Sequence, residues 1–327
     1  MVPLLHSLPP DDEGFLQRVA DFDELNLLTD ITAENLSRIS REHGIDFATA
    51  LLYARFCQSP RHGPFISRIQ ELINAPPRAL GAVKWRVVIV PGALYVERPD
   101  LGGDGQLVRE AAYELGLRCD LVPLASRGSV QENAARLVAW LEQQTDESLV
   151  LVSLSKGGPD IKLALAHPDS ARIFRNVSAW INVCGPIDGT PLADWIIESR
   201  LRSSVMRLQY SMQRRDFGFI TDLRHGLGSP LRNPLRLPDH LRLVSFVGFP
   251  LRRHLSTMLS RFSHRVIAPH GPSDGTVPLA DLLSWPGNIF PVWGADHYFQ
   301  PASMSKSLIT AALHYLAQDF HAHGAWT

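Results

Sequence analysis

The hydrophobic pattern of the chain changes character near residue 80. Before that point, the stretches LTDITAENLSRISREHG and IDFATALLYARFC carry apolar residues at helical spacing, and the first ends on Gly44. The helical pattern stops at Ala75, Pro76 and Pro77, because proline cannot continue a helix and restrains the residue before it. The pattern therefore predicts a helical N-terminal extension over residues 1–80.

After Lys84, short β-branched runs alternate with amphipathic helices such as QLVREAAYELG. The strand-like runs are WRVVIV, the apolar residues around 121–124, SLVLVS, VSAWINVC, LRLVSFVGF and HRVIAP. Strands that alternate with helices are typical of a parallel sheet covered on both faces. The pattern predicts an α/β fold with a mostly parallel sheet flanked by helices.

One strand runs directly into a candidate catalytic motif. In SLVLVSLSKGGPD, a buried strand leads into Ser155 and then into a helix that has Pro159 in its first turn. A sharp strand-to-helix turn exposes a serine hydroxyl and requires small flanking residues, as in a nucleophile elbow. Gly157 meets this requirement, while Ser153 stands where glycine is usual. The motif predicts Ser155 as a nucleophile; the competing interpretation is a turn that merely starts a helix.

A serine hydroxyl is a weak nucleophile near neutral pH, so it needs a base and an acid that orients the base. Downstream, PSDGTVPLADLL contains Asp274 and WGADHYF contains His297, in the chain order Ser, Asp, His. Asp281 and Asp296 are the competing acids. We expect Asp281 on a helix and Asp296 pointing away from the adjacent histidine. The interpretation therefore takes Asp274 as the acid and His297 as the base, the alternative being a loop histidine.

Two backbone N–H groups are expected to stabilise an oxyanion. The N–H of Lys156 lies at the start of the helix after the nucleophile, where the helix dipole favours negative charge. The second donor is expected in the loop after the first core strand, in WRVVIVPGALY, where Ala93 is the first choice. Leu94 is the near alternative, because a shift of one residue cannot be resolved from this pattern.

These motifs together carry a family resemblance. From about residue 86 to 299 the chain resembles the bacterial triacylglycerol lipases of the α/β-hydrolase superfamily, through PGAL, SLSKGGPD, GPIDGTPLADW and SDGTV. It departs from their pattern at Pro91, Ser153 and Leu154. The resemblance implies an α/β-hydrolase domain over residues 81–327, a helical lid at about 192–240 and ester chemistry. The segment HYFQPAS lacks the Asp that many such lipases use for calcium, so no metal site is expected.

The expected activity is that of a carboxylic ester hydrolase acting on a small-molecule or lipid ester through an acyl-enzyme. A thioesterase or acyltransferase would use the same three residues, and a non-catalytic binding module of the same fold is the rival from another class. No cofactor is expected: LGGDGQLV has Val108 where a dinucleotide motif needs its third glycine, and it follows a loop.

The segment from Trp195 to Arg265 concentrates positive charge, with thirteen arginines and four acidic residues. Its first part places apolar residues on one helical face, namely Ile197, Leu201, Val205, Leu208 and Met212. Such a helix is typical of an amphipathic lid or of a peripheral membrane contact. Its arginines would attract anionic groups, either lipid headgroups or a phosphate-bearing acyl donor such as a coenzyme A or carrier-protein thioester. The alternative is an arginine-rich helix packed on the core.

The overall charge and the cysteines limit the expected partners and the cellular compartment. A net charge of −1 and a pI near 6.9 give no reason to expect a nucleic-acid partner. Three widely spaced cysteines argue against a disulfide framework or a zinc cluster. The N-terminus lacks a basic region followed by a long apolar core, and about eighteen consecutive apolar residues occur nowhere. We therefore expect a cytoplasmic protein.

Overall fold

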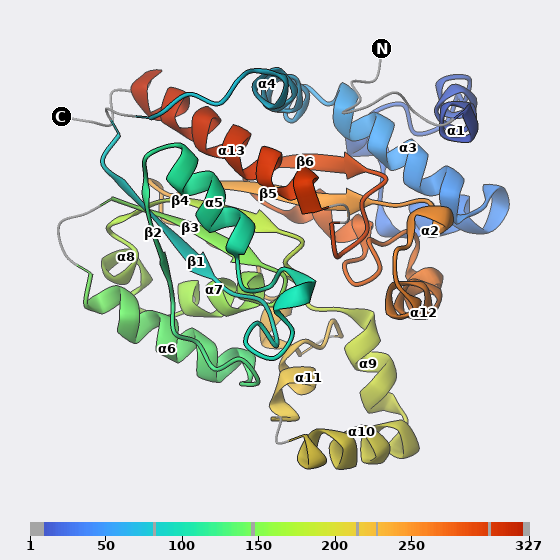
Figure 1. The fold of residues 1–327 in the computed structure, drawn as a ribbon. Coiled ribbons are helices and arrows are strands. Elements are labelled where there is room, and N and C mark those ends of the chain that lie inside the picture. The colour runs from blue at the N-terminus through green and yellow to red at the C-terminus, as the bar shows by residue number, and fades with distance from the viewer. Residues whose placement is uncertain are drawn as a thin grey trace.

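The computed structural model describes residues 10–80, 83–144, 148–213, 216–226, 228–299 and 302–322. At its centre is a six-stranded sheet with the order β2-β1-β3-β4-β5-β6, in which all neighbouring strands are parallel (Figure 1). The strands are β1 (Trp85–Val90), β2 (Arg118–Leu121), β3 (Ser148–Leu154), β4 (Val177–Val183), β5 (Arg242–Phe249) and β6 (Asn288–Trp293). The predicted parallel sheet is thereby confirmed.

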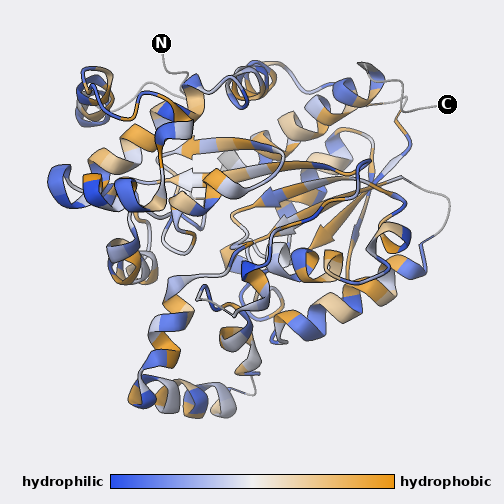
Figure 2. Ribbon diagram, turned by 180° about the vertical axis from the view of Figure 1, so that it is seen from behind, coloured by the Kyte–Doolittle hydropathy of each residue, from blue (hydrophilic) through white to orange (hydrophobic). Residues whose placement is uncertain are grey.

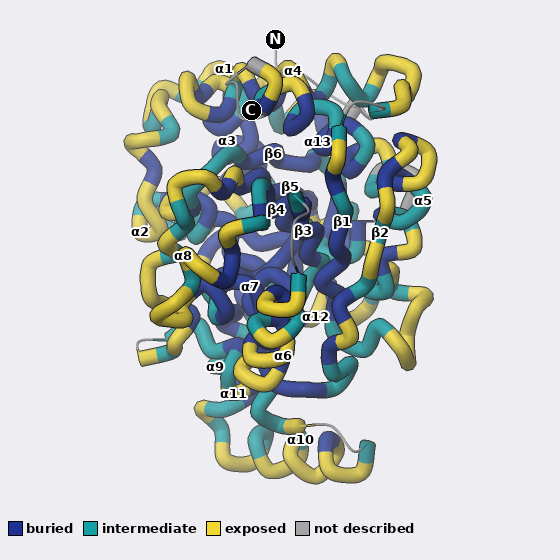
Figure 3. Tube along the Cα trace, turned by 90° about the vertical axis from the view of Figure 1, so that its left-hand side faces the viewer, coloured by how far each residue is buried: buried dark blue, intermediate teal, exposed yellow. Residues whose placement is uncertain are grey.

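Helices cover both faces of the sheet. Alternate residues of β1 enter two hydrophobic clusters: Val87 and Ile89 face one side, and Val88 and Val90 face the other. The first side is covered by α4 (Gly63–Asn74), α5 (Gln106–Glu114) and α13 (Ala302–Ala322). The second is covered by α3 (Ile45–Gln58), α6 (Val130–Glu142) and α7 (Gly157–Leu165), with the short α8 (Ser170–Ile173) nearby. Figure 2 shows the strands as strongly hydrophobic segments, and Figure 3 shows the buried centre.

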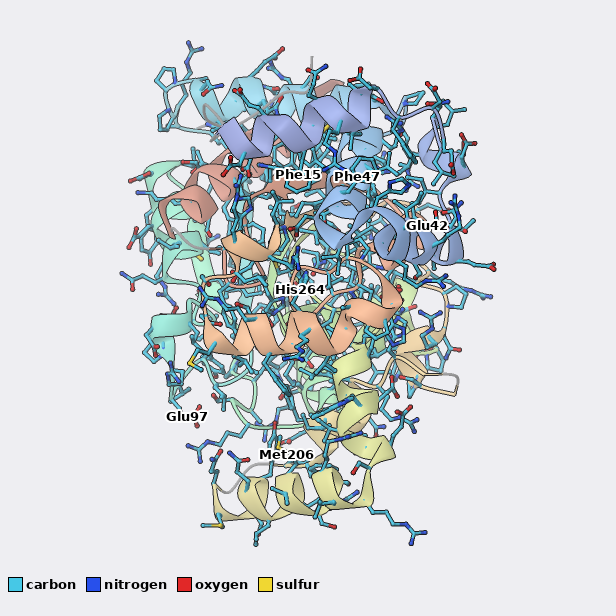
Figure 4. The ribbon with its side chains drawn as sticks, turned by 90° about the vertical axis from the view of Figure 1, so that its right-hand side faces the viewer. Phe15, Glu42, Phe47, Glu97, Met206 and His264 are labelled. Atoms are coloured by element: carbon cyan, nitrogen blue, oxygen red, sulfur yellow. The ribbon has the colours of Figure 1, made fainter. Side chains whose placement is uncertain are left out.

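The N-terminal helices pack on this core. Helices α1 (Pro10–Ala20), α2 (Ala33–His43) and α3 precede α4, and their buried residues share one cluster with strands of the sheet. Phe15 of α1 and Phe47 of α3 are labelled in Figure 4, and the Arg18 guanidinium lies 5.6 and 5.2 Å from their ring centroids. The helices over residues 10–74 contribute to the main core, while the domain boundary near residue 80 stays a prediction.

Between β4 and β5 the chain forms α9 (Pro191–Glu198), α10 (Arg200–Met212) and α11 (Gly218–Asp222), which project below the sheet in Figure 1. The apolar stripe does not lie on one helix, because the chain leaves the helix at Ser199, whose hydroxyl caps α10 by accepting from the Arg202 N–H. On α10, Leu201, Leu208 and Met212 are 75%, 64% and 78% exposed. The stripe therefore faces outward. Arg214 and Arg215 lie outside the described residues.

Two strand predictions need correction, and one strand was missed. The expected strand HRVIAP is wrong, because residues 264–267 belong to α12 (Met258–Ile267) and 268–270 continue as a short 3₁₀ helix. The strand expected around 121–124 lies at Arg118–Leu121 instead. Strand β6 was not predicted at all. Among the described residues, no helix is both long and apolar enough to cross a membrane.

Candidate active site

The turn that holds Ser155 is strained and tightly packed. Strand β3 ends at Leu154, and α7 begins two residues after Ser155, which has φ +47°. Non-glycine residues rarely adopt this left-handed conformation, which costs about 1–3 kcal/mol. The neighbouring strand holds the turn in place, because the Ser155 N–H donates to the Val183 carbonyl at 2.9 Å. The side chain of Ser155 is thereby held at the carboxyl end of the sheet, on the wall of a cavity.

The surroundings of Gly157 and Ser153 show which positions next to Ser155 must be small. A Cβ on Gly157 would lie 2.3 Å from the Val90 carbonyl oxygen, so no side chain fits there. Ser153 fits where glycine is usual, because its hydroxyl donates to Asn182 Oδ1 at 3.0 Å and accepts from Trp180 Nε1 at 2.8 Å. The Ser153 hydroxyl, which glycine would lack, is therefore satisfied by both of its hydrogen bonds.

A Gly157→Ala variant is expected to lose about 1–3 kcal/mol of unfolding free energy, because its new methyl group meets backbone that cannot move without distorting β1. Urea denaturation measures this change. Gly14→Ala is the matched control, since nothing lies within 4 Å of its Cβ and alanine favours a helix. Equal stability of the Gly157→Ala variant and the wild type would contradict the packing argument.

Ser155, His297 and Asp274 form one hydrogen-bonded chain. Ser155 Oγ lies 2.9 Å from His297 Nε2, and His297 Nδ1 lies 3.1 Å from Asp274 Oδ2. The side chains of His297 and Asp274 are 8% and 0% exposed. Asp274 Oδ1 accepts the N–H groups of Thr276 and Val277 at 2.7 and 2.6 Å, which leaves Oδ2 for the imidazole. The three side chains predicted to act together are thus brought together.

The competing carboxylates have other partners. Asp281 lies in a 3₁₀ helix and bonds His225 Nε2 with both oxygens at 3.0 Å. Burial raises the pKa of Asp281, and the hydrogen bond from His225 offsets part of this effect. Asp296 Oδ2 accepts from the N–H and hydroxyl of Ser256, both at 2.7 Å, so it points away from His297 as expected. The geometry favours Asp274.

A cavity of about 610 Å³ opens beside Ser155 and His297. Most of the side chains around it are apolar, and they come from several elements that are distant in sequence. Leu107 of α5 and Ile309 of α13 come from one face of the sheet, whereas Tyr210 of α10, Phe219 of α11 and Leu259 of α12 come from the helices beyond the sheet edge. The cavity suits an apolar group attached to a reactive carbonyl.

Solved structures with a similar fold identify the fold class. A metagenomic carboxyl esterase has a TM-score of 0.59 and 24% identity, covering 75% of this chain and 80% of its own. The propeptide form of the Bacillus licheniformis lipase BlEst2 has a TM-score of 0.51 and 19% identity, covering 69% of this chain and 50% of its own. The chain has the α/β-hydrolase fold. No protein-family model matches the sequence, and no curated protein sequence matches it.

Within this α/β-hydrolase fold, the backbone near Ser155 distinguishes the two candidates for the second oxyanion donor. The N–H of Leu94 donates to the Ser126 carbonyl at 2.9 Å, so it is already engaged. For the N–H groups of Ala93 and Lys156, no acceptor in a loop or turn is found within the described part of the chain. Both residues line the cavity next to Ser155. The pattern favours Ala93 over Leu94.

The Lys156 side chain forms a buried ion pair beside the Ser155 turn. Its Nζ lies 2.8 Å from Asp160 Oδ1 and 3.3 Å from the Ser129 carbonyl, and both side chains of the ion pair are buried. Burial raises the pKa of Asp160 to about 6, although the Lys156 ammonium opposes the shift. The side chain of Lys156 is therefore engaged in this ion pair, which leaves its backbone N–H as the group that could act as an oxyanion donor.

One residue beside the triad was missed by the sequence analysis. Cys184 follows β4, has φ +51° and donates its N–H to the Phe246 carbonyl at 2.9 Å. Burial first, and then the Asp274 carboxylate, raises the pKa of its thiol well above the usual value. The available signal was its place at the end of a predicted strand, because parallel strands bring their carboxyl ends to one edge of a sheet.

Proposed function

We propose that this protein hydrolyses carboxylic esters through an acyl-enzyme on Ser155. The observation that carries the proposal is the hydrogen-bonded chain from Ser155 Oγ through His297 to Asp274 on the wall of an apolar cavity. The name of the carboxyl esterase that shares the fold agrees with this chemistry. Residues 81–327 would form the hydrolase domain, with the lid at about 192–240.

The geometry supports each step of the proposed reaction. Ser155 Oγ attacks the ester carbonyl while His297 Nε2, 2.9 Å away, accepts its proton. The N–H groups of Ala93 and Lys156 donate to the oxyanion, and Asp274 stabilises the imidazolium through Nδ1. His297 then protonates the departing alcohol. Water, deprotonated by His297, attacks the acyl-enzyme, and Ser155 recovers its proton as the acid leaves.

The test of this proposal compares leaving groups and acceptors. We expect hydrolysis of an ester to exceed that of the thioester with the same acyl chain, and water to remain the main acceptor when an alcohol is added. The assay separates the free acid from the transacylated ester by mass spectrometry. A predominance of transacylated product would identify an acyltransferase, and exclusive cleavage of the thioester would identify a thioesterase.

The acyl group is expected to occupy the cavity. Leu107 lines it and is half-buried, so a larger side chain there reduces the space without disrupting the core. A Leu107→Trp variant that excludes two methylene groups would lose about 1.6 kcal/mol of their burial. We expect kcat/KM for a long-chain ester to fall roughly fifteen-fold relative to a short-chain ester, at 0.8 kcal/mol per methylene.

The matched control is Tyr113→Trp, which lies on the same helix but is 61% exposed. Its ratio of long-chain to short-chain kcat/KM should stay that of the wild type. An unchanged ratio in Leu107→Trp as well would show that the acyl chain lies elsewhere.

The lid is proposed to contact a lipid surface. Its exposed apolar residues on α10 have counterparts on α12, where Met258, Leu259 and Phe262 are exposed and Leu259 also lines the cavity. Helix α9 packs against both helices, and Trp195 of α9 contacts Phe262 at 5.6 Å between ring centroids. Figure 4 shows α10 and α12 on one side of the molecule with α9 between them.

Arginines accompany these apolar residues. Arg200 and Arg207 lie on α10, and Arg261 and Arg265 lie on α12. The Arg207 guanidinium lies 4.1 Å from the Phe217 ring centroid. Exposed apolar residues bordered by arginine are the composition expected of a helix that lies on an anionic membrane surface.

Leu208→Glu should weaken binding to anionic lipid vesicles by about ten-fold or more, because it replaces an apolar contact worth roughly 1.5–3 kcal/mol with a charge of the same sign as the lipid. Vesicle sedimentation measures the partition coefficient. Leu27→Glu provides the control, since Leu27 is similarly exposed at 59% but lies in the N-terminal segment. Equal partitioning of wild type and Leu208→Glu would contradict this contact.

A further inference from the structure

Cys184, Asp274 and His297 converge on one point beneath the proposed nucleophile. One ligand atom from each residue, namely the Cys184 sulfur, a carboxylate oxygen of Asp274 and a ring nitrogen of His297, lies within 4.8 Å of the others. We assign His297 Nδ1 to this group, because it is the ring nitrogen that faces Asp274 at 3.1 Å. His297 Nε2 faces Ser155 instead. The group thus presents sulfur, nitrogen and oxygen donors together.

We propose that this group binds a thiophilic divalent cation of the zinc class and that the bound ion blocks the proposed reaction. Zinc favours cysteine sulfur, histidine nitrogen and carboxylate oxygen, at about 2.3, 2.0–2.1 and 2.0–2.2 Å. At a tetrahedral ion these bonds place the ligand atoms about 3.3–3.6 Å apart. The separation of 3.1 Å between His297 and Asp274 already comes close to this spacing. The Cys184 sulfur lies within 4.8 Å of the other two ligand atoms, so closing the set requires an approach of at most about 1.5 Å.

The charges of the proposed site balance. Cys184 is 2% exposed and Asp274 is 0% exposed, so a single negative charge there is poorly solvated. A thiolate and a carboxylate together neutralise a divalent ion, and the thiol releases its proton to solvent as the ion binds. Cys184 and His297 both line the cavity, which gives the ion a path from solvent. The fourth coordination position remains for water.

Inhibition follows from the tautomer of His297, and this step rests on the proposed function. In the reactive form, Nδ1 carries the proton toward Asp274 and the Nε2 lone pair accepts the proton of Ser155. An ion on Nδ1 takes the place of that proton, and the neutral ring then holds its single proton on Nε2. The Nε2 lone pair that should accept the serine proton is then no longer available. The Asp274 carboxylate binds the ion and no longer orients His297. Binding of the ion and activation of Ser155 are therefore mutually exclusive.

A cobalt spectrum tests binding without any catalytic readout. Added Co²⁺ should produce the near-ultraviolet thiolate-to-cobalt charge-transfer band in the full-length wild type, with one ion per chain. The band should disappear in Cys184→Ala and in the closely isosteric Cys184→Ser, which guards against a folding defect. Cys119→Ser, which alters a half-buried cysteine of β2, should keep it. A missing band in the wild type, or a band that survives in both Cys184 variants, would overturn the proposal.

Labelling of Ser155 by a fluorophosphonate tests the inhibition. Added Zn²⁺ should slow labelling of the wild type at least ten-fold, and EDTA should restore it. Comparing each variant with itself, with and without zinc, should give an apparent inhibition constant at least ten-fold higher in Cys184→Ser. Equal zinc sensitivity of the wild type and Cys184→Ser would overturn the proposal. Failure to label the metal-free wild type would instead contradict the proposed function, while the cobalt band would still decide whether the ion binds.

Discussion

A Ser155→Ala variant should show kcat for ester hydrolysis lowered by about 10⁴–10⁶-fold, if the three residues act as a unit. The variant removes the atom that lies 2.9 Å from His297 Nε2, so no acyl-enzyme can form. Steady-state hydrolysis of a chromogenic ester measures the loss. Circular dichroism should show an unchanged fold, since His297 is the only side chain that hydrogen-bonds Ser155 Oγ among the described residues.

The neighbouring serine supplies the matched control. Ser153→Ala removes a buried hydroxyl two residues away that bonds Asn182 and Trp180, so it should reduce stability while keeping kcat within about ten-fold. If Ser155→Ala retained most of its activity, the nucleophile would lie elsewhere. A variant pair with equal losses would indicate that the elbow had simply collapsed.

An Asp274→Asn variant should lower kcat by about 10⁴-fold, the size of effect seen when the orienting acid of a triad becomes an amide. Asp274 Oδ2 accepts from His297 Nδ1 at 3.1 Å and so selects the tautomer with a free Nε2 lone pair. An amide nitrogen in its place would favour the opposite tautomer. The measurement is kcat of the purified variant with the same ester, alongside its urea midpoint.

Asp281→Asn is the control for the acid, because Asp281 bonds His225 rather than His297. Its kcat should stay within about ten-fold of the wild type. The variant weakens a partly buried contact with His225 that is remote from the reaction, so the loss of about 1.5–3 kcal/mol should appear in the free energy of unfolding. Greater loss of kcat in Asp281→Asn than in Asp274→Asn would reverse the choice of acid.

The parts of the site that the sequence could predict are those whose chemistry is local. The elbow around Ser155 joins a buried strand to a helix, and this joint is visible as a change of hydrophobic period with a glycine beside it. Asp274 and His297 could be chosen from the order of residues along the chain together with local context, since Asp281 was expected on a helix and Asp296 to point away from the adjacent histidine. What the order could not show is the packing of the loop after β1. Leu94 is disfavoured as the oxyanion donor because its N–H donates to the carbonyl of Ser126, a residue from the loop after β2.

The errors in the fold have identifiable causes. HRVIAP is rich in β-branched residues but lies in α12, where buried Ser263, His264 and Ile267 follow helical spacing. Strand β6 was overlooked because its run NIFPVW contains Pro291, which argues against a central strand but is tolerated at the edge of a sheet. Cys184 was overlooked because its role depends on which strands are neighbours, a property of topology rather than of local sequence.

The lid illustrates the limit of a hydrophobic pattern. The stripe through Leu201 and Leu208 was expected either on an interfacial helix or against the core, and these alternatives have the same spacing. The apolar stripe of α10 faces outward because Tyr210, on the opposite face of the helix, packs with α9 and α11 in a separate cluster. Which face is buried depends on these partners, which are determined only by the tertiary fold.

Intact-mass analysis after fluorophosphonate treatment tests the central claim most directly, with wild type and Ser155→Ala treated side by side without metal. The account predicts one covalent adduct per wild-type chain, on the peptide that contains Ser155, and no adduct on the variant. A wild type that stays unlabelled, or a Ser155→Ala variant that is labelled equally, would contradict the assignment of Ser155 as an activated nucleophile.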